Sequence, residues 1–232
     1  MLRTLLALPL LAAVTLILGG AGLVAGVVDR SGWLAHRIAR LWGRAALAIV
    51  GVHTLVSGLE HVPGGPAVYA ANHASVLDIP LLFACLPVDF RLVHKSSLSL
   101  LPLIGWYLFL AGHVSIDRGN PFRARRSLAS AVRRIRGGTS VAVFPEGTRS
   151  PDARVRLFKR GSFLLALEAG VPVVPVSLDG VKRVIPQGIL TLRPGMVRVR
   201  VHPALSTARR AASEAGTLAA AARRAVSSGV EL

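Results

Sequence analysis

The stretch AVYAANHASVLDIPLLFACL, residues 67–86, decides the fold. Its first five residues are apolar and predict a short buried strand, and residues 75–86 predict a helix. Asn72 and His73 stand between the two, at the carboxyl end of the strand. Open α/β sheets place their ligand sites at this end of their strands, so the stretch predicts an α/β domain with a functional site over residues 72–78.

Strand and helix patterns continue to alternate along the chain. Residues 121–135 predict a basic helix that begins at Asn120-Pro121 and ends before Gly137-Gly138. Pro172 and Pro175 lie in a further apolar run and indicate a sheet edge or a break there. The other expected elements are strands at 140–144 and 171–178 and a helix at 163–169.

Beyond these elements, residues 190–193 and 196–202 flank a Pro194-Gly195 turn, which predicts a hairpin with one solvent-exposed face. Residues 207–226 are rich in Ala and Arg and predict a peripheral helix. The organisation expected is therefore a membrane-associating segment (1–52), a single catalytic domain (53–206) and a C-terminal helix (207–232).

The N-terminal segment is apolar and then basic. The 25 residues between Arg3 and Asp29 carry no charge, and as a helix they would extend about 37 Å, enough to cross a bilayer. Pro9 and the glycines at 19, 20, 22 and 26 leave a broken or re-entrant helix open. The long run and single leading Arg favour an anchor over a cleaved signal peptide.

Residues 33–52 then read as a basic amphipathic helix at the membrane surface. His36, Arg37, Arg40 and Arg44 recur at helical spacing, beside Trp33 and Trp42. An ordinary surface helix is the alternative. If the first segment spans the bilayer, these positive charges predict that the catalytic domain lies on the cytoplasmic face.

The formal net charge of +17 predicts an anionic partner, either a phosphorylated substrate and an anionic membrane or nucleic acid. The basic residues are spread along helices and loops rather than interleaved with aromatics, which argues against nucleic acid. Cys85 is the single cysteine, so no intramolecular disulfide forms, and its apolar neighbours indicate a buried, inert thiol.

His73 and Asp78 form the first reactive pattern. A histidine just before a helix and an aspartate one turn into it can meet, and the carboxylate would then orient the imidazole as a general base. A substrate hydroxyl could attack directly, without a protein nucleophile. Ser75-x-x-Asp78 is also a capping box, which would explain the aspartate without catalysis, and the spacing leaves both roles open.

The second pattern is FPEGTRS at 144–150, directly after an apolar strand. Gly147 permits close backbone approach to a ligand, Arg149 offers a fork suited to phosphate, and Glu146 accepts from hydroxyls. A polar turn with an exposed salt bridge is the alternative. Lys95 and Arg118 are further basic candidates.

The order of the blocks resembles that of the 1-acylglycerol-3-phosphate acyltransferase family. NHASVLD at 72–78, GHVSIDR at 112–118, FPEGTRS at 144–150 and VPVVPV at 171–176 follow the family's order. The resemblance implies a mixed sheet flanked by helices in one glycerolipid-acyltransferase-like domain, with His73 and Asp78 catalytic. It implies a substrate-binding role for the remaining motif positions Asn72, Lys95, Arg118, Glu146, Gly147, Thr148 and Arg149.

The reaction implied is acyl transfer from acyl-CoA or acyl carrier protein to the sn-2 hydroxyl of a lysophospholipid acceptor, giving phosphatidic acid. Rival acceptors are a lyso-aminolipid, a lysoglycolipid and glycerol 3-phosphate. The rival of another class is a non-enzymatic basic protein that binds membrane or nucleic acid. No cofactor and no metal are expected, because the seven histidines show no paired ligand spacing.

Overall fold

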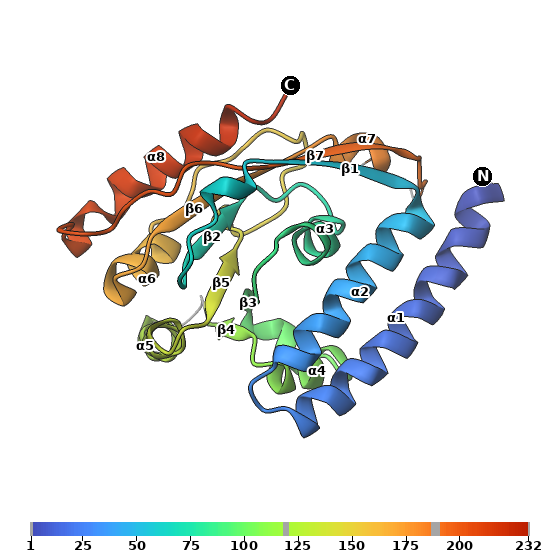
Figure 1. The fold of residues 1–232 in the computed structure, drawn as a ribbon, viewed down its shortest axis with the longest axis horizontal. Helices are drawn as coiled ribbons and strands as arrows, with labels where there is room; N and C mark the ends of the chain where they lie inside the picture. The colour runs from blue at the N-terminus through green and yellow to red at the C-terminus, as the bar shows by residue number, and fades with distance from the viewer. Residues whose placement is uncertain (1, 118–120, 187–190, 232) are drawn as a thin grey trace.

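Seven strands form one sheet in the order β1-β7-β6-β2-β5-β3-β4, with helices on both of its faces (Figure 1). The computed structural model describes residues 2–117, 121–186 and 191–231. Neighbouring strands are parallel except β6 and β7, so the sheet is mixed, as predicted. The strands are β1 (Val52–Ser57), β2 (Val68–Ala71), β3 (Phe90–Lys95), β4 (Val114–Ile116), β5 (Ser140–Val143), β6 (Val173–Asp179) and β7 (Gly195–Val201).

Strand β2 is buried on both sides because successive side chains point to opposite faces of the sheet. Tyr69 and Ala71 join the apolar cluster beneath α1, α2 and α3, and Val68 and Ala70 join the cluster beneath α5, α6 and α8. The helices are α1 (Leu2–Val28), α2 (Trp33–Val50), α3 (Asp78–Cys85), α4 (Ile104–Leu110), α5 (Pro121–Arg136), α6 (Gly161–Ala169), α7 (Val181–Val184) and α8 (Ala215–Ser227), with 3-10 turns η1 (Leu59–His61), η2 (Ser96–Leu100) and η3 (Ala212–Glu214).

The predicted hairpin at 190–202 is wrong. Strand β7 alternates buried valines with exposed arginines as expected, but it pairs with β1 in parallel and with β6 in antiparallel. Residues 191–193 are irregular, and residue 190 lies outside the described residues. The valine face packs into the apolar cluster that includes residues of α2 and α3. The pairing of β7 with two distant strands is not something that a local turn signal reveals. Helix α8 is also shorter than the 207–226 expected.

The two prolines of the VPVVPV run do not place β6 at an edge, since it lies between β7 and β2. The Pro175 carbonyl accepts the His202 N–H, just beyond the end of β7. The nitrogen of a strand residue points to the same side as its carbonyl, so the Pro175 nitrogen also faces this end of β7. The β6–β7 pairing begins only at Val176, opposite Val201. Pro175 therefore lacks a donor only at the end of that ladder, and the expected edge or break does not form.

Helix α1 is continuous through Pro9, so the broken helix left open by the sequence does not occur. Its glycines serve packing instead. A Cβ added at Gly22 would lie 2.8 Å from the Tyr107 ring, and one at Gly26 would lie 2.8 Å from the Leu110 Cβ. The stretch Thr4–Val28 is long and apolar enough to cross a membrane, and 17% of its most apolar window is buried. The glycines allow α4 to approach the α1 backbone closely.

Helix α1 is also fastened along its length. The Thr4 hydroxyl accepts the Leu192 N–H at 3.2 Å, and the Trp42 indole of α2 donates to the Thr15 hydroxyl at 3.0 Å. The N-terminal helices therefore pack as part of the same unit as the sheet.

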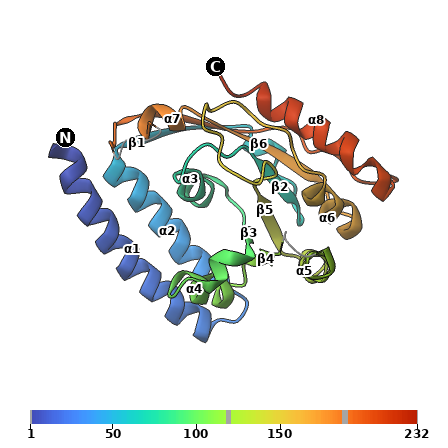
Figure 2. The same cartoon turned by 180° about the vertical axis from the view of Figure 1, so that it is seen from behind.

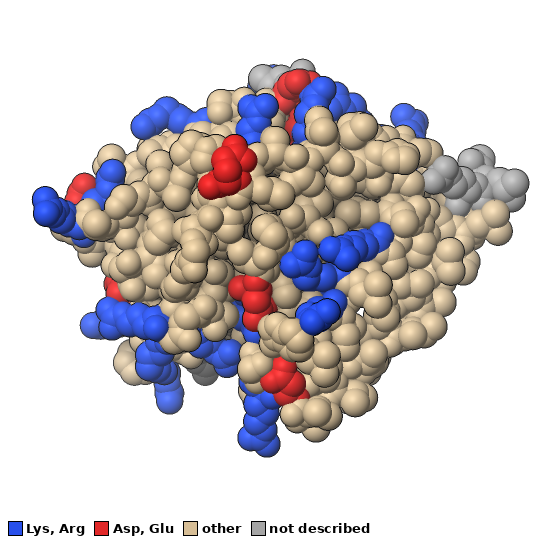
Figure 3. All heavy atoms as spheres, viewed as in Figure 1, with Lys and Arg blue, Asp and Glu red and all other residues tan. Residues whose placement is uncertain are grey.

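Helix α2 forms over nearly the predicted range and exposes Arg37 and Arg44 of its basic stripe, while Arg40 is half-buried. Figure 3 shows a group of basic side chains over this helix. Arg37, Arg40 and Arg44 border a hollow of about 650 Å³, and the Arg37 guanidinium lies 4.8 Å from the Trp33 ring centroid. His36 was expected on this basic face and is instead buried, 4.9 Å from Phe90 between ring centroids.

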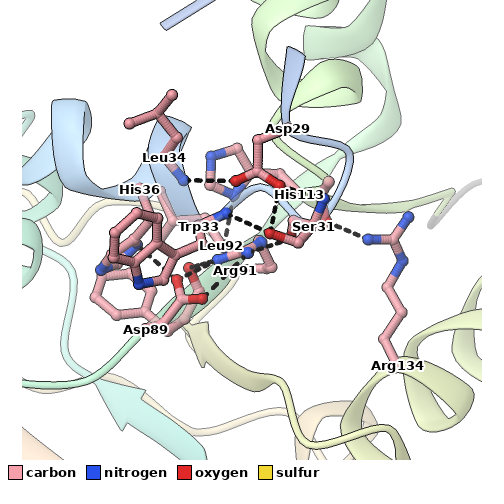
Figure 4. Close-up of polar contacts among 12 residues, drawn as sticks. Asp29, Ser31, Trp33, Leu34, His36, Asp89, Arg91, Leu92, His113 and Arg134 are labelled. Carbon is pink, nitrogen blue, oxygen red and sulfur yellow. Dashed lines mark hydrogen bonds and ion pairs between the residues drawn. The ribbon is translucent and has the colours of Figure 1, made fainter. Parts of the chain in front are cut away.

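A polar network joins the α1–α2 turn to the sheet (Figure 4). The buried Arg91 guanidinium of β3 donates to the Ser31 carbonyl at 2.7 Å and pairs with Asp89. Asp29 accepts the Leu34 N–H at 2.8 Å and so holds the start of α2. In the loop after α4, His113 Nδ1 accepts a backbone N–H of β3 at 2.9 Å. The turn, β3 and the α4 region are therefore held together.

The stability of this junction is expected to fall as the pH is lowered from about 6.5 towards 4. Burial lowers the pKa of His36 from 6.5 to about 4, and Asp89 offsets this only in part. The unfolded chain therefore binds more protons in this window, and the loss attributable to His36 is at most about 3 kcal/mol.

Unfolding in detergent micelles from pH 7 to pH 4 measures this effect. A His36→Phe variant keeps a ring between Phe83 and Phe90 but cannot titrate. Its stability should fall less than that of the wild type over the same window. An identical pH dependence in both proteins would contradict the role given to His36.

Candidate active site

His73 and Asp78 meet at the end of β2. The Nδ1 atom of His73 lies 2.7 Å from Asp78 Oδ2, the Asp78 side chain is fully buried, and the His73 side chain is 17% exposed. A carboxylate only accepts hydrogen bonds, so Nδ1 carries the proton and Nε2 keeps a free lone pair. The arrangement is that of an oriented general base.

Asp78 also shapes the turn before α3. Its Oδ2 accepts the backbone N–H groups of Ala74 at 2.7 Å and Ser75 at 2.8 Å. The Ser75 bond is one half of the capping box, while the Ser75 hydroxyl accepts from Leu77 instead of Asp78. The two interpretations of Asp78 therefore coexist: one oxygen holds both the turn and the imidazole.

Glu146 connects the FPEGTRS loop to the histidine turn. Its Oε1 accepts the backbone N–H of His73 at 3.0 Å, and the Ser150 N–H donates to the His73 carbonyl at 2.7 Å. Burial raises the pKa of Glu146, and the hydrogen bond from His73 opposes that shift. Both backbone groups of His73 are thus fixed by the second motif.

Phe144 adds an aromatic support. Its ring stacks on the His73 imidazole with centroids 4.1 Å apart and planes 19° apart. The stacking leaves the ring free to turn only within its own plane, where Asp78 then sets its orientation.

Asn72 faces the sheet. Its side-chain amide donates to the Leu178 carbonyl at 2.9 Å, and its oxygen accepts the Leu178 N–H at 2.8 Å. The residue is almost fully buried. This geometry favours a positioning role for Asn72, fixing the end of β2 against β6, over the predicted contact with substrate.

The other predicted residues that the structure describes follow strands whose carboxyl ends share this edge of the sheet. Thr148 and Arg149 are exposed in the loop after β5, where Gly147 has a φ of 80° that glycine tolerates. Lys95 is exposed at the end of β3, the strand next to β5. Arg118 lies outside the described residues.

Three contributors to the site carried no sequence signal of their own. Phe144 and Ser150 belong to a recognised motif, but nothing in the motif shows that they contact His73. Leu178 is 106 residues from Asn72 along the chain, and only its backbone is used. Such contacts depend on how the strands are ordered in the sheet.

The family model described as "Acyltransferase" matches residues 53–179. A 1-acyl-sn-glycerol-3-phosphate acyltransferase from Chlamydomonas reinhardtii is 42% identical over 200 residues, 83% of this chain and 57% of that protein. A chloroplastic enzyme of that name from Arabidopsis thaliana is 39% identical over 171 residues, 72% of this chain and 47% of that protein. The chain thus spans about half the length of these relatives.

The crystal structure of the 1-acyl-sn-glycerophosphate (LPA) acyltransferase PlsC from Thermotoga maritima is similar over nearly the whole chain. Its TM-score is 0.81 at 30% identity, with 98% of this chain and 93% of that chain covered. Together with the ordered motifs and the paired His73 and Asp78, these similarities show that the chain belongs to the acyltransferase family, in the branch named 1-acyl-sn-glycerol-3-phosphate acyltransferases.

Proposed function

We propose that this protein transfers an acyl chain from acyl-CoA or acyl carrier protein to the sn-2 hydroxyl of 1-acyl-sn-glycerol-3-phosphate. The product is phosphatidic acid, a phospholipid precursor. The observation that carries the proposal is the 2.7 Å contact between His73 and the fully buried Asp78, in a chain with the family's ordered motifs. The acceptor is drawn from membrane lipids, and the catalytic domain lies on the cytoplasmic face.

In the reaction, His73 Nε2 takes the proton of the acceptor hydroxyl as that oxygen attacks the thioester carbonyl carbon. Asp78 stabilises the imidazolium that forms. The tetrahedral intermediate then collapses, the carbon–sulfur bond breaks, and the imidazolium returns the proton to the departing thiolate. The ester and the free thiol are the products, and His73 is restored.

The oxyanion of the intermediate needs hydrogen-bond donors. Carboxylates already occupy the N–H groups of His73, Ala74 and Ser75. The sequence led us to expect donors near this turn, and these three amides are unsuitable. Within the described turn, the backbone N–H of Val76 is the remaining candidate, and Val76 is exposed.

Arg149 is proposed to hold the acceptor phosphate. Arg149→Lys keeps the charge but loses the planar fork, so the acceptor KM should rise roughly tenfold, equivalent to one charge-assisted hydrogen bond of about 1.4 kcal/mol. Steady-state kinetics with lysophosphatidic acid measure this. Arg154→Lys is the matched control, because Arg154 is exposed in the same loop and faces Asp152. Equal acceptor KM values in both variants would remove Arg149 from the phosphate site.

Purified protein tests the function directly. A panel of lysophosphatidic acid, a lyso-aminolipid, a lysoglycolipid and glycerol 3-phosphate is assayed with labelled acyl-CoA and acyl carrier protein as separate donors. Preferred acylation of lysophosphatidic acid supports the proposal, and preference for another acceptor replaces it. Salt-sensitive binding of nucleic acid without turnover would favour the non-enzymatic alternative.

A further inference from the structure

The segment between Lys95 and Val114 exposes an unusual number of large apolar side chains. Residues 96–111 contain no Asp, Glu, Lys or Arg. Leu100, Trp106 and Phe109 are 83%, 60% and 81% exposed. We call these three, together with Leu98, Leu103 and Ile104, the α4 surface; all six are exposed. A patch of this kind, left open to water, marks an interaction site.

The α4 surface is joined to the apolar face of α1. Tyr107 and Leu110 of α4 pack on Gly22 and Gly26 of α1, so the two helix backbones are close. Figures 1 and 2 both show α4 beside the C-terminal half of α1. On that half of α1 the exposed side chains are again apolar: Leu16, Ile17, Val24, Val27 and Val28. The helices therefore present neighbouring apolar surfaces, held in a fixed relation.

The η2 part of the α4 surface lies at the functional edge of the sheet. The chain leaves β3 at Lys95, forms η2 and α4, and returns through β4, where Ile116 pairs with Lys95. Because β3 and β4 are parallel to β2, their carboxyl ends share the edge on which His73 stands. Whatever covers the η2 end of the α4 surface therefore lies at the edge that carries His73, while α4 runs back toward the amino end of β4.

We propose that η2 and α4 form a second membrane-inserting element that enters the same leaflet as α1. The occupant is the acyl region of a lipid bilayer. Continuity with the apolar face of α1 carries this choice, as do two exposed basic residues, Arg30 just after α1 and Lys95 just before η2, which suit anionic headgroups. Trp106 suits the interface between the two regions.

The element deepens the proposed function, on which its role in acceptor delivery rests. With α4 in the leaflet, Lys95 and the end of β3 lie at headgroup level, where the phosphate of a membrane-resident lysophospholipid is found. The acceptor can then reach His73 without leaving the bilayer.

Fluorescence of Trp106 tests the insertion without any need for turnover. The full chain with Trp33→Phe and Trp42→Phe retains Trp106 alone, since the protein has three tryptophans. It is reconstituted into vesicles of phosphatidylcholine and phosphatidylglycerol, with or without bromine on the acyl chains. Bromine within the bilayer should quench Trp106 at least about twofold, and unbrominated lipid should shift its emission to shorter wavelength.

Unquenched Trp106 in the reconstituted protein would overturn the proposal. Emission in detergent that shifts to shorter wavelength as protein concentration rises would also overturn it, because a second copy of the chain would then cover the α4 surface. A Trp106→Phe variant, which retains the other two tryptophans, measures the background quenching.

A kinetic test separates insertion from chemistry. Trp106→Ser/Phe109→Ser should raise the apparent KM for vesicle-embedded acceptor about tenfold and leave that for a monomeric short-chain acceptor unchanged. Met196→Ser removes a comparably exposed apolar side chain from β7 and should change neither. Equal effects on both acceptors would overturn the delivery role. If the wild type transfers no acyl chain to either acceptor, the proposed function fails while the fluorescence result still decides insertion.

Discussion

Replacement of His73 by alanine is expected to lower kcat for acyl transfer by about 10²–10⁴-fold, the range of a lost general base. The variant should still fold. Asp78 keeps its bonds to the Ala74 and Ser75 N–H groups, and the backbone N–H of residue 73 can still donate to Glu146. Single-turnover kinetics with saturating acceptor and donor measure the chemical step.

His53→Ala is the matched control, because His53 is an exposed histidine on β1. It should transfer acyl chains at the wild-type rate. Unchanged turnover by a folded His73→Ala protein, shown folded by its thermal unfolding transition, would exclude His73 as the base.

Asp78→Asn should lower kcat by about 10³–10⁴-fold, as in other enzymes whose orienting aspartate is amidated. The Asn oxygen can accept the Ala74 and Ser75 N–H groups, so the turn is retained. The same oxygen, in the place of Oδ2, still accepts from His73 Nδ1, but the amide carries no negative charge. The imidazolium that forms in the reaction is then no longer stabilised by a carboxylate, so Nε2 becomes a weaker base.

The double variant His73→Ala/Asp78→Asn separates this explanation from general damage to the site. If Asp78 acts only through His73, the double variant should be no slower than His73→Ala alone. Multiplied losses would show that Asp78 contributes independently of the imidazole. A large fall in the melting temperature of Asp78→Asn would instead assign its effect to the turn.

The centre of the fold was predictable because its signals are local. The apolar run at 67–71 and the polar pair that follows it gave β2 and the position of His73. The short spacing to Asp78 allowed both the cap and the catalytic pair, and the buried geometry uses both. The order of the motifs then identified the family before any contact was known.

The sheet order was not predictable, because it rests on long-range pairing. Strand β1 (Val52–Ser57) was missed: its pairing with β7 joins segments more than 140 residues apart. Pro175 wrongly indicated an edge, because the run itself does not show where β7 ends. The proline is tolerated within β6 because β7 ends beside it, and that end is set by the fold. His36 shows the same limit, since helical spacing placed it with the arginines while Phe83 and Phe90 enclose it.

The hydrogen bonds and helix contacts of α1 determine what happens when its residues are removed. Thr4 accepts a hydrogen bond from the Leu192 N–H, and α4 packs on Gly22 and Gly26. A protein shortened to begin at α2, as is often done to improve solubility, would uncover the backs of Tyr107 and Leu110 and lose the partner of the Leu192 N–H. The apolar helix therefore also covers part of the fold, and shortened forms should aggregate even in the absence of lipid.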